Sequence, residues 1–130
     1  MAKATATLNY VDYNITAEVG RHKVTVDEPV INGGQDTGPA ATDYLNIALA
    51  SCTATTMKMY ANRKQWKIDS LVVEVDKETS AEGKNIFKRT LYIKGTLDSE
   101  QLTRLMQIAN VCPVHKILSH GNTVETVMGK

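Results

Sequence analysis

The sequence predicts a single domain of the α+β class, in which antiparallel strands pack against long helices. Three patterns support this prediction: short strands near the start of the chain, a long apolar helix, and a strand hairpin followed by further helices. The chain has 130 residues, of which 42% are hydrophobic and 22% charged. A chain of this size can bury one core without disulfides or a structural metal, so we expect one domain over residues 1–130.

Three short strands are expected at the start, over 6–10, 14–19 and 22–27. In the last of these, Val24 and Val26 alternate with polar residues, which is typical of a sheet with one face in water. The following segment, 28–39, contains three glycines and two prolines. This composition predicts a loop, and a loop of this length in a compact domain is often functional.

The clearest helical pattern runs from Thr42 to Arg63, with Thr42 or Asp43 as the expected N-cap. Apolar residues fall on more than one side of this helix, so we expect it to be buried on most faces. At about 1.5 Å per residue it is about 33 Å long, close to the diameter of the whole domain. One small domain can hardly cover such a helix, and we infer that a second subunit helps to cover it.

The pattern after this helix returns to strands. Leu71, Val73 and Val75 alternate with more polar residues, and a second long strand is expected over 86–96. The polar segment 79–84 separates the two, which predicts an antiparallel hairpin.

The remaining chain is expected to form two helices and a strand. Asp98 and Gln101 predict a capping box at the start of the first helix. Pro113 favours a new short helix over 114–120, because proline fits the first helical position. A last strand is expected over 123–128.

Charge and composition exclude several functional classes. The 15 Lys and Arg residues against 14 Asp and Glu give a net charge of +1, which offers little attraction to nucleic acid or anionic membrane surfaces. No apolar stretch has the length of a signal or membrane segment, so we expect a soluble, cytoplasmic protein. Nucleotide-binding, zinc-protease and esterase motifs do not occur, and no cofactor is expected.

The two cysteines, Cys52 and Cys112, have different local settings. Cys52 lies in the middle of the long helix, where a free cysteine is often packed as a small apolar residue. Its activation requires a cation or hydrogen-bond donors from elsewhere in the fold. Cys112 precedes Pro113 at an expected helix start, where free N–H groups favour a thiolate, and His115 can add positive charge when protonated. Local chemistry therefore favours Cys112 as the thiolate, with a packed cysteine at a helix kink as the alternative.

Other residues offer weaker candidates. Arg21, in an expected turn, can pair with a thiolate or a carboxylate, although a turn arginine is most often solvated. Cys112, His115 and His120 form a Cys-x2-His-x4-His pattern that could bind zinc together with Cys52. Structural zinc sites usually show closer paired ligands in both halves, so we do not expect a metal.

Three segments together resemble the OsmC/Ohr superfamily of osmotically inducible and organic-hydroperoxide-resistance proteins. They are Asp27-Glu28-Pro29 with Gly33-Gly34-Gln35-Asp36-Thr37-Gly38-Pro39, Asp43-Tyr44-Leu45 with Ala48-Leu49-Ala50-Ser51-Cys52-Thr53-Ala54, and Ile108-Ala109-Asn110-Val111-Cys112-Pro113-Val114-His115. Their order and spacing match from about residue 20 to the end of the chain, and most resemble the general OsmC-like branch.

The resemblance implies an intertwined homodimer with long cysteine-bearing helices at its centre and sheets outside. It also implies reduction of organic hydroperoxides by a peroxidatic Cys52, whose sulfenic acid is resolved by Cys112 as a disulfide. A dithiol or lipoyl-bearing protein is the implied reductant. For the order of attack we follow the resemblance, because a fold can bring a cation to a mid-helix thiol.

Two positions depart from the best-studied members. Their thiolate-binding arginine falls around 11–13, where this chain has Val11-Asp12-Tyr13, and Arg21 in a later turn is the substitute candidate. Their glutamate, ten residues before the first cysteine, is replaced by Thr42, with Asp43 beside it. Two alternative functions follow: a binder of small molecules or lipids with little peroxidase activity, and a purely structural dimer module.

Overall fold

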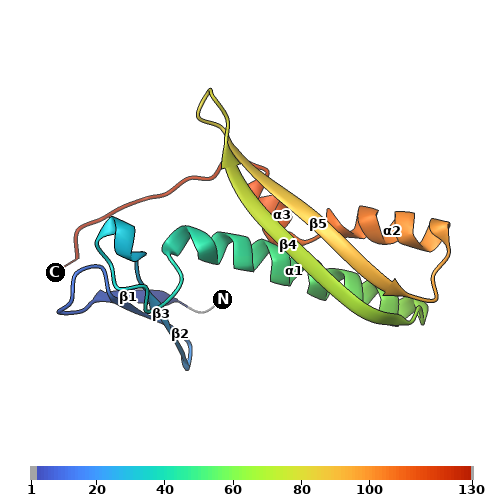
Figure 1. Ribbon diagram of the computed structural model, residues 1–130, viewed down its shortest axis with the longest axis horizontal. Helices are drawn as coiled ribbons and strands as arrows, with labels where there is room; N and C mark the ends of the chain where they lie inside the picture. Colours follow the sequence, from blue (N-terminus) through green and yellow to red (C-terminus); the bar gives the residue numbers. More distant parts are fainter. Residues whose placement is uncertain (1–2, 130) are drawn as a thin grey trace. The chain divides into compact units, whose positions relative to one another are not determined.

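The computed structural model describes residues 3–129 and has the α+β architecture expected from the sequence. In chain order its elements are β1 (Ala4–Leu8), β2 (Ile15–Val19), β3 (His22–Val26), η1 (Val30–Asn32), α1 (Ala41–Lys64), β4 (Ile68–Thr79), β5 (Asn85–Gly95), α2 (Ser99–Ala109) and α3 (Pro113–Leu118) (Figure 1). The chain divides into two compact units, Met1–Leu45 and Asn46–Lys130, and α1 runs from one into the other. The single domain over 1–130 stays a prediction.

The first unit contains an antiparallel sheet in the order β1-β2-β3. The expected strands are present, but β1 ends at Leu8 because the chain turns immediately afterwards. Asn9 N–H donates to the carbonyl of Asn14 at 2.9 Å, and Tyr13 has a positive φ of 68° within this turn. A left-handed residue suits a tight turn, so the reversal cannot continue the strand.

The loop after β3 is organised by Asp27, whose side chain is buried. The hydroxyl of Thr37 donates to this carboxylate at 2.6 Å, and the N–H groups of Thr37 and Glu28 donate at 3.1 and 2.8 Å. The bond from the Thr37 hydroxyl is the main reason that the pKa of Asp27 is lowered. These bonds explain why an acidic residue opens this Gly-rich and Pro-rich loop.

Helix α1 matches the expected helix to within one residue at each end, but its cap differs from the expectation. The helix begins at Ala41, and neither Thr42 nor Asp43 is the N-cap. Instead, the Asp43 carboxylate reaches back and accepts a hydrogen bond from Ala40 N–H at 3.0 Å. A carboxylate in the first turn satisfies a free N–H and also interacts well with the helix dipole.

The burial of α1 is narrower than expected from the sequence. Its buried residues form one stripe at i, i+4 spacing: Leu49, Thr53, Met57 and Ala61. On other sides Ile47 and Met59 are 47% and 63% exposed. The single chain thus buries one stripe of α1, and burial on most faces, which was expected with a second subunit, stays a prediction.

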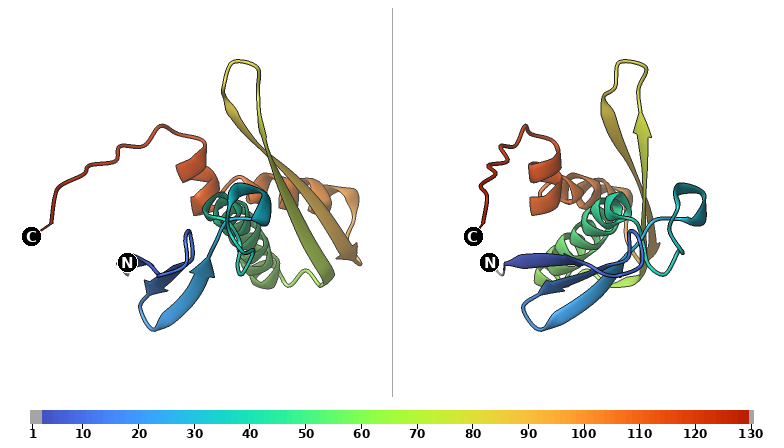
Figure 2. Two further views of the ribbon diagram at one scale, coloured as in Figure 1. Left: turned by 60° about the vertical axis from the view of Figure 1, so that its left-hand side comes forward. Right: turned by 90° about the vertical axis from the view of Figure 1, so that its left-hand side faces the viewer.

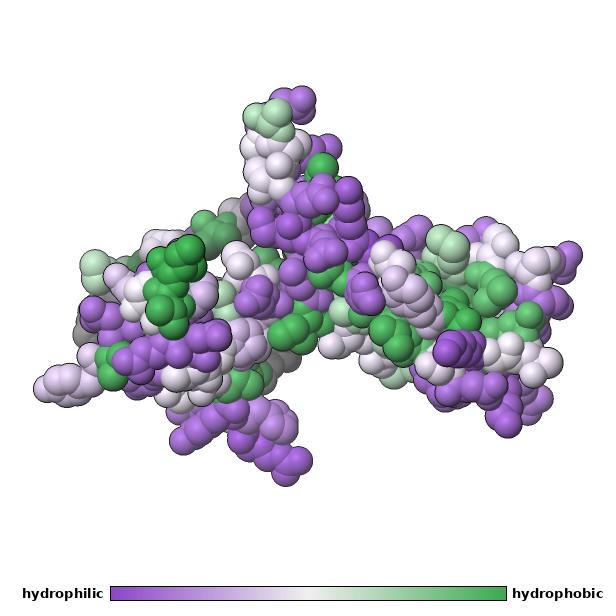
Figure 3. All heavy atoms as spheres, in the orientation of Figure 1, coloured by the Kyte–Doolittle hydropathy of each residue, from purple (hydrophilic) through white to green (hydrophobic). Residues whose placement is uncertain are grey.

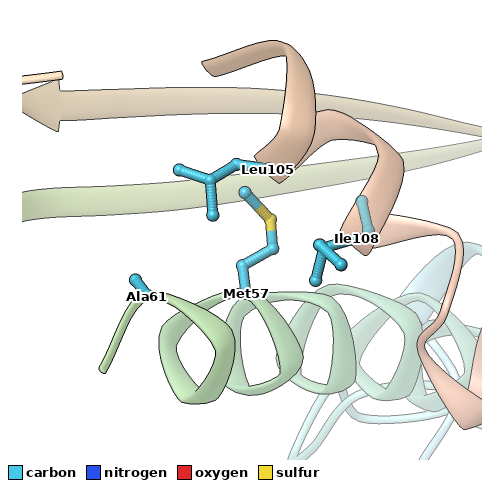
Figure 4. Close-up of a cluster of buried hydrophobic side chains, with 5 residues drawn as sticks. Met57, Ala61, Leu105 and Ile108 are labelled. Carbon is cyan, nitrogen blue, oxygen red and sulfur yellow. The ribbon is translucent and has the colours of Figure 1, made fainter. Parts of the chain in front are cut away.

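The second unit is built on the β4–β5 hairpin, whose register places Leu71 opposite Ile93 and Val73 opposite Leu91. Figures 1 and 2 show α1 and α2 on the same side of this twisted hairpin. The buried cluster between them comprises Met57, Ala61, Leu105, Ile108 and Ala109, and Figure 4 shows Met57 reaching between Leu105 and Ile108. The apolar face of the hairpin packs against this cluster.

The outer face of the hairpin is different in character. Lys88 and Glu78 form an exposed ion pair at 3.1 Å there. Figure 3 shows mostly hydrophilic side chains over the half of the hairpin near its turn. The alternation of polar and apolar side chains along the two strands thus gives the hairpin one solvent-exposed face and one face that packs on the helices.

The two helices after the hairpin begin as expected. Asp98 caps α2 and forms a full capping box with Gln101. Cys112 caps α3, and Pro113 occupies its first turn. Helix α3 ends at Leu118, two residues before the expected end.

The strand expected over 123–128 is wrong, because 121–129 contains neither helix nor strand. An extended segment becomes a strand only when its backbone groups pair with a neighbour, and none of the sheets in the described residues includes this segment. Among residues 3–129, no helix combines the length and apolar character needed to span a bilayer.

Replacing Leu105 by alanine should lower the free energy of unfolding by about 3 kcal/mol, because a fully buried leucine leaves a cavity in the cluster. Urea denaturation followed by circular dichroism measures the change. Met106→Ala is the matched control, since Met106 is the next residue and 63% exposed. Equal losses in both variants would contradict the assigned core.

Candidate functional site

The fold brings the two cysteines together from distant parts of the sequence. Cys52 lies in the middle of α1, and Cys112 lies at the N-cap of α3. Both are free thiols, and each shifts the pKa of the other, as neighbouring side chains do. Cys112 is fully buried, whereas Cys52 is partly exposed. The site is therefore a reduced pair in which one sulfur is more accessible than the other.

Several hydrogen-bond donors surround Cys112. Burial by itself raises the pKa of this thiol, but hydrogen bonds outweigh burial, and the pKa of Cys112 is lowered overall. The contributors, in order of size, are the Cys52 thiol, the N–H of His115, the Thr53 hydroxyl and the N–H of Val114. His115 N–H lies 3.4 Å from the Cys112 sulfur. Donors that favour the charged form make Cys112 the thiolate of the pair.

The pKa of Cys52 moves in the opposite direction. Burial is the main cause of its rise, and the hydrogen bond to Cys112 adds to it. The N–H of Val114 and the Thr56 hydroxyl lower the pKa of Cys52 only in part. Of the two thiols, Cys112 therefore ionises more readily than Cys52.

Thr53 connects the pair to the rest of the unit. Its hydroxyl donates to the carbonyl of Leu49 at 2.6 Å and accepts a hydrogen bond from Arg89 Nη1 at 3.0 Å. A hydroxyl has one proton, so it can serve either the Leu49 carbonyl or the Cys112 sulfur at one time. If the Thr53 hydroxyl rotates to donate to the Cys112 sulfur, its hydrogen bond to the Leu49 carbonyl of α1 is lost.

Arg89 is the functional residue that the sequence interpretation missed. Its Nη1 donates to Thr53 and to the carbonyl of Ala109 at 3.1 Å, and its Nη2 donates to Asn110 Oδ1 at 2.7 Å. A signal was present in the sequence. Side chains alternate between the two faces of a strand, so Arg89 points to the same face of β5 as Phe87 and Leu91, the face that packs on the helices. A charged residue at an inward position needs partners, and often marks a site.

His115 contributes differently from the expectation that its ring adds positive charge. Arg89 Nη2 lies 3.3 Å from His115 Nδ1. Since a guanidinium only donates, Nδ1 must accept, and the ring is neutral with its proton on Nε2. Burial, followed by the charge of Arg89, lowers the pKa of His115. The backbone N–H of His115, and not its ring, contacts the Cys112 sulfur.

The other candidates from the sequence lie in the first unit. Arg21 is exposed in the turn between β2 and β3. Thr42 and Asp43 lie in the first turn of α1, where Asp43 is engaged by Ala40 N–H. The contacts around the two thiols described above all come from the second unit.

A cavity of about 350 Å³ lies beside Arg89 and His115. Its lining includes the apolar side chains of Leu49, Phe87 and Leu118. A larger hollow of about 490 Å³ runs along α1 and β4, and neither space has a cysteine among the residues that line it. The smaller cavity combines an apolar wall with two polar residues next to the thiol pair: Arg89 bonds to Thr53, the neighbour of Cys52, and the His115 N–H contacts the Cys112 sulfur. A mainly apolar wall with a few polar groups is the usual character of a binding pocket for a small organic molecule.

Metal binding by the cysteines and histidines finds no geometric support in residues 3–129. Within that part of the chain, no three Cys, His, Asp or Glu side chains are grouped as metal ligands. In particular, His115 directs Nδ1 at Arg89, and His120 Nδ1 lies 2.7 Å from the carbonyl of Lys116.

Comparison with known proteins places the chain in a family. Residues 34–127 match the model of the OsmC-like protein family, and the chain belongs to it. No curated protein matches this sequence. The family match confirms the resemblance inferred from the cysteine and glycine segments.

Solved structures share the fold. An OsmC-like protein from Mycoplasma pneumoniae has a TM-score of 0.77 at 22% identity, over 92% of this chain and 87% of that chain. An organic hydroperoxide resistance protein from Legionella pneumophila has a TM-score of 0.65 at 18% identity, over 91% and 88%. Another such protein, from Elizabethkingia anophelis, has a TM-score of 0.65 at 20% identity, over 90% and 86%. At these identities the likeness confirms the fold.

Titration of single-cysteine variants should show Cys112 ionising before Cys52. We expect the thiolate absorbance of Cys52→Ser, which keeps Cys112, to rise at a pH about one unit or more below that of Cys112→Ser. In Cys52→Ser, the serine hydroxyl can still donate a hydrogen bond to Cys112. In Cys112→Ser, burial still raises the pKa of Cys52. Ultraviolet absorbance against pH is the measurement, with the double serine variant as blank. The opposite order would contradict the assigned charge.

Proposed function

We propose that this chain is a thiol peroxidase that reduces organic hydroperoxides. The observation that carries the proposal is the pair of neighbouring free thiols, one with a lowered pKa and the other partly exposed. Family membership supports it, as do fold neighbours described as organic hydroperoxide resistance proteins.

In this proposal Cys52 attacks first, because it is the more accessible sulfur of the pair. Its thiolate attacks the distal oxygen of the hydroperoxide, the O–O bond breaks, and the alkoxide leaves and takes a proton to become the alcohol. Cys52 becomes a sulfenic acid. Cys112 then attacks the Cys52 sulfur, a disulfide forms, and the hydroxyl leaves as water. Two electrons from an external dithiol or lipoyl group restore the thiols.

The cavity beside Arg89 supplies a place for the organic group of the substrate. Leu49, Phe87 and Leu118 offer apolar contacts, and Arg89 and His115 border the same space. Hydrogen peroxide has no apolar group to bury, so a cavity of this kind favours alkyl and aryl hydroperoxides over it. We place the reaction in the cytoplasm, where a reducing environment keeps both thiols free.

Two cysteine variants test the proposal. Cys52→Ser should abolish turnover of cumene hydroperoxide with a dithiol, because the attacking sulfur is gone. Cys112→Ser should retain the first oxidation and accumulate a sulfenic acid that dimedone traps at Cys52, as detected by mass spectrometry. Ser51→Ala, at the exposed neighbouring position, is the matched control and should keep full turnover.

Full turnover in Cys52→Ser would overturn the peroxidase proposal. The alternative is a small-molecule or lipid binder that uses the same apolar cavity. A hydrophobic ligand that co-purifies in native mass spectrometry, together with thiols that resist a modest peroxide excess, would favour that alternative.

We also propose a homodimer, since α1 leaves Ile47 and Met59 exposed on sides that the single chain does not cover. A second copy would bury this apolar surface and stabilise the long helix. Light scattering coupled to size-exclusion chromatography should give twice the mass of one chain. The mass of a single chain across the working concentration range would refute the dimer.

A further inference from the structure

We propose that Arg89 is the positioning residue of the thiol pair: its four hydrogen bonds hold the start of α3, which Cys112 caps, against α1, which carries Cys52. The catalytic role of this positioning rests on the proposed peroxidase function. The placement of charge can be tested without turnover, so the two can fail separately.

The first argument is geometric. Arg89 projects from β5 and bonds to α1 through Thr53, to the end of α2 through the Ala109 carbonyl, to the following residue Asn110, and to α3 through His115. Each of these partners lies within three residues of one of the cysteines. A planar guanidinium with donors in fixed directions can hold several partners in register, which an ammonium group cannot do.

The second argument is electrostatic. Arg89 is partly buried, and its attraction to Cys112 opposes the lowering of the Arg89 pKa by burial. An arginine stays charged under these conditions, so a fixed cation lies close to the thiolate. The titratable groups around this centre are Cys52 on α1, His115 on α3, and His120 just beyond the end of α3. Because His115 is neutral, Arg89 is the source of positive charge among these groups.

The third argument concerns the reaction. Cys52 must lose its proton to attack, and its hydrogen-bond partner is the Cys112 thiolate. Transfer of that proton to Cys112 creates the Cys52 thiolate without a base from solvent. After the O–O bond breaks, the alkoxide takes a proton from water. The proton on Cys112 then departs with the sulfenic hydroxyl as water when the disulfide forms. Cys112 thus acts first as the proton acceptor and then as the resolving thiol.

Arg89→Met in the Cys52→Ser background tests the placement of charge. Methionine keeps an unbranched apolar stem but removes the cation and its four bonds. The thiolate absorbance of Cys112 should shift to higher pH by about one unit. Lys88→Met is the matched control, because Lys88 is the adjacent cation on the outer face of β5 and should produce no shift. Arg89→Lys keeps the charge without the planar fork and should shift the titration by less than Arg89→Met.

A second readout uses the protein with both cysteines. In a single turnover with cumene hydroperoxide at a pH where Cys112 is ionised, Arg89→Met should speed oxidation of Cys52 about tenfold, because a rise of about one unit in the pKa of Cys112 makes transfer of the Cys52 proton to it about ten times more favourable. Thermal unfolding identifies any loss of fold, in which case Arg89→Lys provides the test. An unchanged Cys112 titration in a folded Arg89 variant would overturn the inference, even if the protein reduces hydroperoxides. A shifted titration in a protein that reduces no hydroperoxide would uphold the charge placement and reject the peroxidase function.

Discussion

The candidate site depends on the groups that surround one sulfur in a place from which water is largely excluded. Cys112 is fully buried, and an isolated thiolate there would be costly. The N–H of His115 and the neighbouring Cys52 thiol offset part of that cost. Arg89 organises these groups from the hairpin, so β5 contributes to the site although it contains no reactive residue.

The sequence predicts those parts of the fold that local patterns determine. The capping box of Asp98, the alternation around Leu71 and the long α1 all appear as expected. The prediction of a strand over 123–128 was wrong, because a strand needs a neighbouring strand to pair with. Alternation of residues alone does not show whether such a neighbour exists. The predicted N-cap of α1 was wrong by a few residues. Asp43 lies within the first turn of the helix, where its carboxylate accepts a hydrogen bond from Ala40 N–H.

The candidate site was predictable only in part. The two cysteines and the favoured ionisation of Cys112 follow from motif and helix position, but the cation does not. Arg89 is distant in sequence from both thiols, and only the hairpin register aims it at them. The sequence interpretation assigned the charge to His115 or Arg21, because local reasoning cannot anticipate a contact that tertiary packing creates. The guanidinium also fixes His115 as a hydrogen-bond acceptor, which removes it as a cation.

The cap of α3 links the oxidation state of the pair to the stability of the helix. In the reduced protein the Cys112 sulfur accepts a hydrogen bond from His115 N–H and carries charge next to Arg89. A sulfur in a disulfide is uncharged and a far weaker acceptor, so oxidation deprives both groups of their partner. Interactions present only in the dithiol form make a disulfide a stronger oxidant. A disulfide between these two cysteines, as in the proposed reaction, would therefore have a potential that favours its return to two thiols.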